Sequence, residues 1–371
     1  MRLRSTARVA DRSLPSFSLS LPGTRRAVVV GAGSFGTAVA VLLVRAGLRT
    51  TLQARSAQQA DRLRSDRENR VYLPGVELPP QLRVETVDAG LSRAELVFLG
   101  VPSRGLDEVI ASLGRAGLPP RAAIVSLAKG LVPPDGIAPT ILLRDRFGED
   151  RVACIGGPAH AREMVSEGAG LVAASTSEEL AGTLADVFKR AGVVCEEADD
   201  PVGVELAGAA KNAAALAAGA TEGQGLNAAG AAAGHIFAEV WRYAEAQGAR
   251  PESFIGLAGT GDLVGTALAP QSRNRRAGEL LADGVPTAEI PGRIGQAVES
   301  LDLVPLLARA LTRAGVEAPV TGGLARLIGG ELPLDGWVSL VRTTVPTPAR
   351  RRRRPQGGRG SIWARLFRRG G

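Results

Sequence analysis

The stretch RAVVVGAGSFGTAVAVLLVRAG (residues 26–47) joins a short apolar run, a glycine-rich turn and an apolar helical pattern that ends at Gly47. Gly31, Gly33 and Gly36 form a G-x-G-x-x-G motif between the expected strand and helix. The first glycine permits a tight turn, the second lets a pyrophosphate approach the backbone, and the third allows close helix–strand packing. The glycine pattern alone is weak, but its strand–turn–helix context favours a dinucleotide site over a plain turn.

A second expected strand, RTTLQAR (residues 49–55), follows at the distance typical of such a unit. NAD-specific sites carry Asp or Glu near the end of this strand, where the carboxylate binds the ribose 2′-hydroxyl. This chain has Arg55 there instead, and an arginine can pair with a 2′-phosphate. We therefore favour NADP as the cofactor and leave NAD open, because arginine is abundant throughout this chain.

Further apolar runs alternate with helical patterns up to residue 200, in ELVFLGVPS, AAIVSLAKG, RVACIGGP, GLVAAS and GVVCEE. From Pro201 the strand-like runs stop, and Ala/Leu-rich helical patterns take over at 202–220, 229–248, 273–283, 302–314 and 319–329. The sequence thus predicts an α/β fold: a Rossmann-type doubly wound, mostly parallel sheet followed by an all-α C-terminal domain. The expected divisions are a disordered basic extension (1–26), a dinucleotide-binding domain (27–200), a helical substrate and catalytic domain (201–343) and a disordered basic tail (344–371).

The charge of the chain is concentrated at its two ends. Of the net +8, residues 1–26 contribute +5 and residues 350–371 contribute +9, which leaves residues 27–349 at −6. A nucleic-acid-binding domain would carry its basic residues on one folded face, so we expect no nucleic-acid partner. The C-terminal SIWARLFRRGG (361–371) is either a disordered tail or a short basic amphipathic helix in weak contact with anionic lipid.

The remaining composition argues for an ordinary globular protein in a reducing compartment. Cys154 and Cys195 give no disulfide framework, and two histidines are too few for a zinc site, so we expect no metal. No apolar run approaches the ~18 residues of a membrane span. We expect a cytoplasmic location.

Lysine is rare in this chain: only Lys129, Lys189 and Lys211 occur among 45 basic residues. Lys211, beside Asn212, interrupts an alanine-rich stretch that otherwise reads as buried helix. Arginine keeps its proton under all relevant conditions, whereas a lysine can be tuned to release one and take it back. We therefore interpret Lys211 as a proton-transfer residue. Lys129 follows a strand at the edge of the sheet where ligands bind, whereas Lys189 resembles an ordinary exposed helical residue.

A third cluster lies in GLAGTGDLVGTALAPQSRNRRAGELL (residues 256–281). Asp262 stands in a glycine-rich turn, and Ser272 is a plausible cap for a helix whose first turn contains Arg273 and Asn274. Positive charge in a first helical turn opposes the macrodipole, and a bound phosphate would reverse that effect. The alternative is a solvated basic turn with no ligand.

Taken together, these stretches resemble the bacterial-type NAD(P)-dependent glycerol-3-phosphate dehydrogenase family over most of residues 27–330. The motifs that carry the resemblance, in order, are GAGSFGTA, NRVYLPG, VPS, AKGL, GGPAHARE, VGVELAGAAKN, FIGLAGTGDL, QSRNRR, IGQAVES and APVTGGLARLI. The resemblance implies reversible reduction of dihydroxyacetone phosphate to sn-glycerol 3-phosphate for glycerophospholipid biosynthesis, and a homodimer.

The resemblance also implies roles for individual residues. Lys211 matches the acid/base lysine of the family, Lys129 a second active-site lysine, and Asp262 a carboxylate that arranges the lysine and the substrate hydroxyls. The implied substrate contacts are Lys129, Gly157, Lys211, Asp262, Ser272, Arg273 and Asn274. The implied cofactor contacts are Gly31, Gly33, Ser34, Phe35, Gly36, Arg55, Lys129, Ala161, Arg273, Ala297 and Glu299.

The chain departs from the family pattern in two places. Ala159 stands where the family usually has Ser or Thr, and the segment 221–239 is slightly short, with His235 in place of an arginine. These departures leave open an alternative, a divergent non-catalytic or altered-substrate paralogue of the same fold. A non-catalytic paralogue would be expected to have lost Lys211 or Asp262, and both are present.

Overall fold

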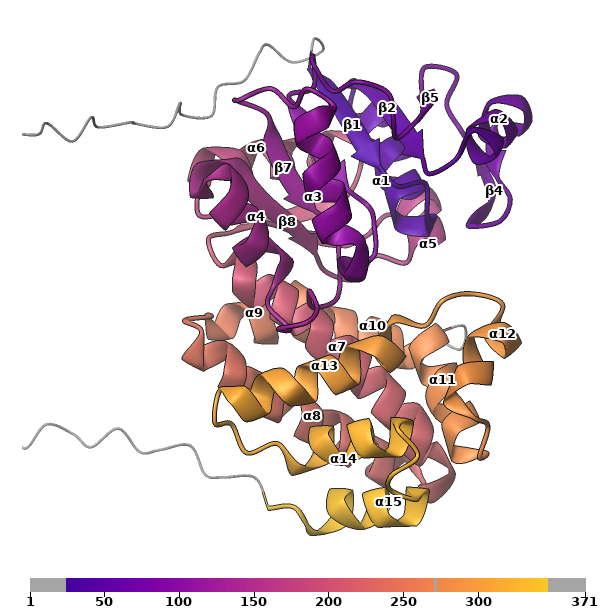
Figure 1. Ribbon diagram of the computed structural model, residues 1–371, viewed down its shortest axis with the longest axis vertical. Coiled ribbons are helices and arrows are strands. Elements are labelled where there is room, and N and C mark those ends of the chain that lie inside the picture. The colour runs from indigo at the N-terminus through magenta and orange to yellow at the C-terminus, as the bar shows by residue number, and fades with distance from the viewer. Residues whose placement is uncertain (1–24, 270–271, 346–371) are drawn as a thin grey trace, which may run out of the picture.

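The computed structural model describes residues 25–269 and 272–345, which form a sheet-containing domain stacked on a helical one (Figure 1). The two basic terminal segments that we expect to be disordered lie almost entirely outside the described residues. So does the C-terminal segment that we consider for lipid contact.

The sheet has eight strands in the order β10-β9-β8-β7-β6-β1-β2-β5. All neighbouring pairs are parallel except β8 and β9, so the expected doubly wound, mostly parallel sheet is confirmed. The strands are β1 (Arg26–Val30), β2 (Arg49–Ala54), β5 (Arg83–Thr86), β6 (Leu96–Leu99), β7 (Ala123–Ser126), β8 (Val152–Gly156), β9 (Gly170–Ala174) and β10 (Val194–Ala198).

Helices cover both faces of this sheet because its strands are apolar on both sides. In β1, Val29 faces a core that it shares with helices α1 and α6, whereas Val28 and Val30 face a second core with α3 and α4. The helices of this domain are α1 (Ser34–Arg45), α2 (Ala57–Asp66), α3 (Leu106–Arg115), α4 (Pro139–Phe147), α5 (Ala161–Ser166) and α6 (Glu178–Arg190), with 3-10 turns at Ser103–Gly105 and Glu149–Arg151.

The antiparallel step between β8 and β9 is a feature that the apolar runs do not reveal. The connection from β8 to β9 leaves and re-enters the sheet at the same end of the strands. The two backbones lie close together there, because a side chain on Gly157 would collide with the carbonyl oxygen of Gly170. Helix α5 packs against α1 instead of crossing back along β8. The chain therefore returns in the opposite direction.

Two further elements in the region 66–86 were not expected from the sequence. The short strands β3 (Glu68–Asn69) and β4 (Leu73–Glu77) form an antiparallel hairpin beside the main sheet, and β5 adds an edge strand. Their runs are short and polar, so they lack the apolar signature of the central strands. The hairpin holds the NRVYLPG motif next to the glycine-rich turn.

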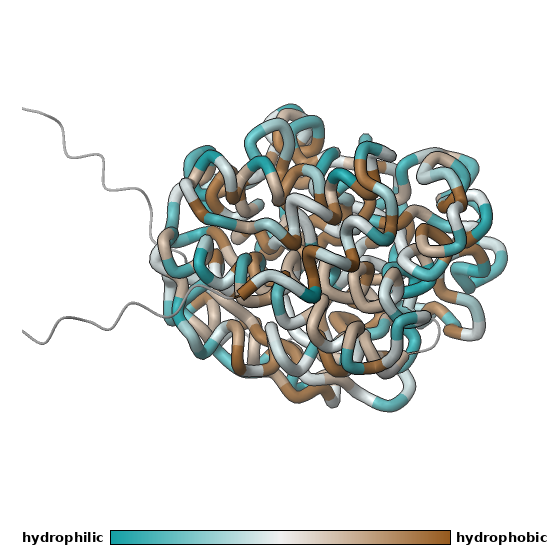
Figure 2. The backbone as a smooth tube through the Cα atoms, turned by 90° about the horizontal axis from the view of Figure 1, so that it is seen from below, coloured by the Kyte–Doolittle hydropathy of each residue, from teal (hydrophilic) through white to brown (hydrophobic). Residues whose placement is uncertain are grey.

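The second domain is entirely helical in its described residues and is built around α7, whose residues are almost all buried. Figure 2, seen from this end, shows brown and teal segments alternating along the chain, as expected for amphipathic helices around one core. Its elements are α7 (Pro201–Thr221), α8 (Leu226–Ala246), α9 (Pro251–Ile255), a π-helical turn (Leu257–Gly261), α10 (Asp262–Leu268), α11 (Arg273–Ala282), α12 (Ile290–Ile294), α13 (Glu299–Arg313), α14 (Pro319–Ile328) and α15 (Leu334–Thr343), with 3-10 turns at Glu222–Gln224 and Thr287–Glu289.

Helix α7 also joins the two domains. Val204 near its start packs with Cys154 of β8 and Val172 of β9. The last strand ends at Ala198 and α7 begins at Pro201, capped by the side chain of Asp200. We propose the division 27–200 and 201–343 on this basis.

Candidate active site

The glycine-rich turn leaves β1 and opens α1. Gly31 has φ +111°, and a side chain there would strike the carbonyl group of Gly100 on the adjacent strand connection. A side chain on Gly36 would collide with the carbonyl oxygen of Gly31, so the third glycine permits the close helix–strand contact. Gly33 differs, because no atom lies within 4 Å of the position its Cβ would take.

The open position at Gly33 is where the motif predicts that a dinucleotide pyrophosphate approaches the backbone. No side chain caps the N-terminus of α1, so its positive end is not satisfied by a side-chain oxygen. Ser34 and Phe35, the first two residues of α1, are both partly exposed beside the space. The turn therefore has the properties of an anion cradle that the motif predicts.

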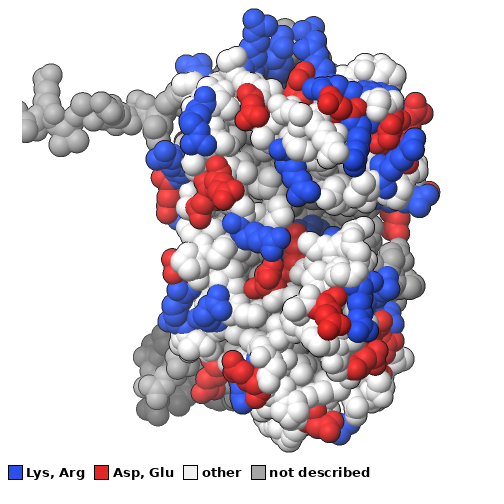
Figure 3. Space-filling view, turned by 45° about the vertical axis from the view of Figure 1, so that its right-hand side comes forward, with Lys and Arg blue, Asp and Glu red and all other residues white. Residues whose placement is uncertain are grey.

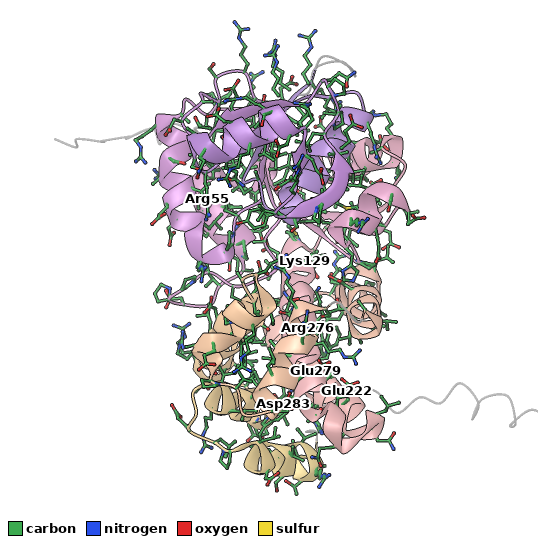
Figure 4. The ribbon with its side chains drawn as sticks, turned by 90° about the vertical axis from the view of Figure 1, so that its right-hand side faces the viewer. Arg55, Lys129, Glu222, Arg276, Glu279 and Asp283 are labelled. Atoms are coloured by element: carbon green, nitrogen blue, oxygen red, sulfur yellow. The ribbon has the colours of Figure 1, made fainter. Side chains whose placement is uncertain are left out.

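Arg55 directly follows β2 and is exposed. Its backbone N–H donates to Gln59 Oε1 at 3.3 Å, and Gln59 in turn donates to the carbonyl of Ala32 in the glycine-rich turn. Figure 4 places Arg55 in the sheet domain, well separated from Lys129 at the domain junction. Arg55 therefore lies beside the glycine-rich turn and apart from the lysine cluster.

The two rare lysines meet at one carboxylate. Lys129 Nζ donates to Asp262 Oδ2 at 2.8 Å, and Lys211 Nζ lies 3.2 Å from Asp262 Oδ1. The three side chains come from the loop after β7, from α7 and from the first residue of α10, so both domains contribute. The side chains of Lys211 and Asp262 are 10% and 4% exposed, and that of Lys129 is 17% exposed.

A helical turn positions Asp262, where the sequence suggested a glycine-rich loop. The π-helical turn Leu257–Gly261 precedes α10, and a side chain on Gly259 would collide with the carbonyl of Phe254. The turn thus needs glycine to pass close to α9. Thr266, one turn after Asp262 on α10, accepts a hydrogen bond from Lys211 Nζ at 3.1 Å.

Burial and charge tune this cluster. Burial and the nearby charge of Lys129 lower the pKa of Lys211 from 10.5 to about 8, although Asp262 and Glu299 act in the opposite direction. Burial by itself would raise the pKa of Asp262, but the two ammonium groups outweigh it and hold that pKa below its usual value. The site therefore combines an ionised carboxylate with a lysine whose pKa is lowered to about 8.

Lys129 is held by three different contacts. Besides Asp262, its ammonium donates to the carbonyl of Gly157 at 2.8 Å and lies 5.5 Å from the centre of the Phe35 ring. Gly157 has φ +99° and a neighbouring carbonyl where a side chain would sit, so its backbone is fixed. The predicted residues Lys129, Gly157 and Phe35 thus link the lysine cluster to the glycine-rich turn.

Two amides join the next predicted segment to this cluster. Asn212 Nδ2 donates to the Lys129 carbonyl at 2.9 Å, and Asn274 Nδ2 donates to Asn212 Oδ1 at 2.8 Å. Asn212 and Thr266 are absent from the site that the sequence predicts. The sequence marks Asn212 only as the neighbour of Lys211, and the one signal for Thr266 is its spacing of four residues from Asp262.

Helix α11 starts as the sequence predicts. The Ser272 side chain accepts from the Arg275 N–H at 3.4 Å and caps the helix, and Arg273 is exposed in its first turn. Arg273 Nη1 donates to the Ala297 carbonyl at 3.1 Å and to Gln296 Oε1 at 3.3 Å. This pairing draws the predicted residues Arg273 and Ala297 together.

The other predicted positions lie around this centre or apart from it. Glu299 begins α13, is exposed and is one of the charges that act on Lys211. Ala161 begins α5 and packs against the core of the sheet domain. Lys189 is half exposed and 3.4 Å from Glu197, as expected of an ordinary surface residue.

The two departures from the family pattern lie outside the lysine cluster. Ala159 packs against the core of the sheet domain. The divergent segment 221–239 contains the end of α7, the 3-10 turn Glu222–Gln224 and the first part of α8, which is unbroken from Leu226. His235 on α8 lines a small cavity of about 50 Å³ with Glu239 and Arg242. The divergent segment therefore leaves Lys129, Lys211 and Asp262 in contact.

Within the described residues, no group of three or more His, Cys, Asp and Glu is placed to bind a metal ion. In that same part of the chain, none of the helices has the length and apolarity needed to cross a bilayer.

Basic and acidic side chains are interspersed over most of the face in Figure 3.

A Rossmann-type domain whose glycine cradle adjoins a buried lysine–carboxylate cluster, completed by Lys211 and Asp262 of a helical domain, defines a two-domain nicotinamide-dependent dehydrogenase. Family models named NAD-dependent glycerol-3-phosphate dehydrogenase N-terminus and C-terminus match residues 26–181 and 200–339. The chain belongs to this NAD-dependent glycerol-3-phosphate dehydrogenase family, as its motifs suggested.

Individual relatives agree with the family assignment. A glycerol-3-phosphate dehydrogenase [NAD(P)+] of Deinococcus radiodurans is 39% identical over 316 residues, 83% of this chain and 92% of the relative. One from Thermus thermophilus is 39% identical over 306 residues, 81% of this chain and 93% of the relative. The crystal structure of glycerol-3-phosphate dehydrogenase from Coxiella burnetii superimposes with a TM-score of 0.81 at 29% identity, covering 87% of this chain and all of that one.

Proposed function

We propose that this chain is an NAD(P)-dependent sn-glycerol-3-phosphate dehydrogenase, which reversibly reduces dihydroxyacetone phosphate to sn-glycerol 3-phosphate for glycerophospholipid biosynthesis. The observation that carries this proposal is the contact of Lys129 and Lys211 with Asp262 at the domain junction. A ketone reduction needs a proton donor beside the nucleotide, and this cluster supplies one from the helical domain. The family assignment supports the choice of substrate.

Bound NAD(P)H supplies the hydride for the ketone carbon. Lys211 acts as the general acid that protonates the carbonyl oxygen, and in the reverse direction its neutral form accepts the hydroxyl proton. A pKa of about 8 makes both forms accessible near neutral pH. Asp262 stays ionised between the two ammonium groups and orients Lys211, with Thr266 as the second partner of that ammonium.

The substrate phosphate belongs at the start of α11 in this proposal. Arg273 and Asn274 lie in the first turn of that helix, and Ser272 caps it. The cation and the helix N-terminus both favour an anion there. Asn274 also connects through Asn212 to the backbone of Lys129, so the start of α11 is tied to the loop that carries this lysine.

The cofactor is NADP or NAD, and we favour NADP. The cradle at Gly31, Gly33 and Gly36 with the start of α1 would hold the pyrophosphate, and Arg55 would pair with a 2′-phosphate. The contacts that we assign to Ser34, Phe35, Ala161, Ala297 and Glu299 follow from the resemblance. Steady-state rates with NADPH and NADH side by side test the preference, and equal kcat/KM for the two would remove it.

The direct test of the proposed function mixes purified full-length protein with NADPH or NADH and dihydroxyacetone phosphate, and follows loss of the reduced nicotinamide. We expect turnover that needs the substrate phosphate, so dihydroxyacetone without phosphate serves as the control. Absence of turnover with both nucleotides would contradict the proposal and favour a non-catalytic paralogue. Faster turnover of an unphosphorylated ketone or keto acid would favour an altered substrate.

Three finer points belong to the same proposal. We propose a homodimer, as the resemblance implies, and light scattering on the full chain tests it. We place the enzyme in the cytoplasm, which the free, buried state of Cys154 and Cys195 supports. Weak lipid contact through the C-terminal tail is tested by liposome co-sedimentation of the full chain and a form ending at residue 349.

A further inference from the structure

Two side-chain amides outside the G-x-G-x-x-G motif donate hydrogen bonds to the glycine-rich turn. Asn69 Nδ2 and Gln59 Nε2 both donate to the carbonyl oxygen of Ala32, each at 3.1 Å. Asn69 ends β3 in the NRVYLPG motif, and Gln59 lies in the first turn of α2. Two elements outside the G-x-G-x-x-G segment therefore fix the direction of one peptide group inside it.

The same network reaches the next peptide group. Asn69 Nδ2 also donates to Thr37 Oγ1 at 2.8 Å, and Thr37 Oγ1 donates to the Gly33 carbonyl at 2.7 Å. Asn69 is 3% exposed and Thr37 is fully buried, so water does not compete for these bonds. Asn69 Oδ1 accepts from the Tyr72 N–H at 3.3 Å, so the amide has a partner on each side and one orientation.

The consequence for the turn follows from peptide geometry. In a trans peptide the carbonyl and the following N–H point in opposite directions. With its carbonyl held toward Asn69 and Gln59, the Ala32–Gly33 peptide directs the Gly33 N–H away from them. Gly33 is also the residue of the turn whose Cβ position is open, which marks the side where a pyrophosphate approaches.

We propose that Asn69 and Gln59 are positioning residues for the dinucleotide: they hold the Ala32 carbonyl away from the pyrophosphate, so that the Gly33 N–H points toward it. This inference rests on the proposed function for the identity of the ligand. Gln59 also accepts from the Arg55 N–H, so it connects the pyrophosphate turn to the residue assigned to the 2′-phosphate. Neither side chain needs to touch the cofactor.

The test measures NADPH binding directly, by nucleotide fluorescence on the full-length protein, and then the steady-state constants. Asn69→Asp keeps the shape and the acceptor for Tyr72 but removes both donated hydrogen bonds and sets a negative charge against two oxygens. Gln59→Leu removes one donor at a half-exposed position where folding is less at risk. We expect the Kd for NADPH to rise roughly tenfold to a hundredfold for Asn69→Asp and a few-fold for Gln59→Leu.

Comparing the effects on KM with those on kcat distinguishes a positioning role from a general structural role. The KM for NADPH should rise with the Kd, while kcat at saturating nucleotide and the KM for dihydroxyacetone phosphate stay near their wild-type values. Matched controls are Gln58→Leu, one residue away and exposed, and Asn227→Asp, exposed on α8, and both should bind as the wild type does.

The proposal is overturned if the folded variants bind NADPH within twofold of the wild type, or if both KM values rise in parallel. Should Asn69→Asp fail to fold, Gln59→Leu decides, and wild-type affinity there overturns the proposal. This outcome is distinct from failure of the proposed function, which appears as absence of wild-type turnover with dihydroxyacetone phosphate even though NADPH binds.

Discussion

The groups around Lys211 determine the pKa of its ammonium. Its ammonium lies 3.2 Å from Asp262 Oδ1 and its side chain is one-tenth exposed, and a second ammonium, that of Lys129, contacts the same carboxylate. Burial favours the neutral lysine and the carboxylate favours the charged one, so the balance leaves a pKa of about 8. An arginine at this position would stay protonated and could not complete a proton cycle.

Replacing Asp262 should move the pH dependence of reduction in a defined direction. In the wild type, kcat/KM for dihydroxyacetone phosphate should fall as the pH rises through about 8, because Lys211 loses the proton it donates. In Asp262→Asn the carboxylate that raises the pKa of Lys211 is gone and Lys129 remains, so the fall should occur at lower pH. A pH series of steady-state rates measures the shift.

The control for this experiment is Asp283→Asn, an exposed residue that Figure 4 places far from Lys129. Its pH profile should match the wild type. An Asp262→Asn profile that falls at the same pH as the wild type would show that Lys211 does not set the pH dependence.

The sequence is informative about individual residues where their type is unusual. Lysine is rare here, which marks Lys129 and Lys211. The glycine spacing indicates the cradle, and the end of the second strand, which lacks an acidic residue, indicates Arg55. Asn212 and Thr266 have common residue types in ordinary helical stretches. Their contacts depend on how α7 and α10 face each other, which spacing along one chain does not encode.

At the scale of elements, two glycines set how α11 crosses α7. A side chain on Gly278 of α11 would collide with the Leu216 carbonyl, and one on Gly219 of α7 would collide with the Arg275 carbonyl. The two backbones therefore approach directly. This crossing places the first turn of α11, with Arg273 and Asn274, beside the segment of α7 that carries Lys211.

Gly278→Ala should loosen this crossing. We expect a loss of about 1–3 kcal/mol of stability from overpacking, and a larger rise in the KM for dihydroxyacetone phosphate than for NADPH. Gly234→Ala is the matched control, because it is a helical position on α8 with no neighbour within 4 Å, and it should gain about 0.5–1 kcal/mol. Equal melting temperatures and equal KM values for the two variants would refute the role of this crossing.

A buried carboxylate on α7 also hydrogen-bonds to the sheet domain. Glu205 is 4% exposed, and its Oε2 accepts from the Thr140 N–H at 2.8 Å and from Thr140 Oγ1 at 2.6 Å. Its Oε1 has no hydrogen-bond partner among the described residues. Burial accordingly raises the pKa of Glu205 from 4.5 to about 7.

This raised pKa predicts a pH-dependent stability difference between the wild type and Glu205→Gln. A group with a raised folded-state pKa binds more protons when folded, so its contribution is present at low pH and is lost as the pH rises through about 7. The wild type should therefore lose stability relative to Glu205→Gln between about pH 5 and about pH 8. Thermal unfolding across that range measures it, and a constant difference would contradict the assignment.

Strand and helix patterns were predictable where burial imposes a clear period, as in β1, β2, α1 and α7. The antiparallel direction of β9 was not predictable, because an apolar run does not show which way its strand runs. The strands β3 and β4 were not predictable either, because they are short and polar. The hairpin they form nevertheless carries Asn69, so the part of the fold least visible in the sequence supports the nucleotide turn.

For the whole molecule, the arrangement of the two domains is what assembles the site. The sheet domain supplies the glycine cradle and Lys129 at the carboxyl edge of its strands, and the helical domain supplies Lys211, Asp262 and the start of α11 (Figure 1). Neither domain by itself contains both the glycine cradle and Lys211, the proton donor that we propose. Reduction accordingly depends on the junction that α7 maintains.

We propose that Lys211 provides the proton for reduction at this junction. The most direct measurement compares kcat for dihydroxyacetone phosphate in wild type, Lys211→Met and Lys211→Arg, alongside the Kd for NADPH. We predict that both variants lose roughly 10²–10⁴-fold in kcat while binding NADPH as the wild type does. Wild-type kcat in either variant would contradict the account.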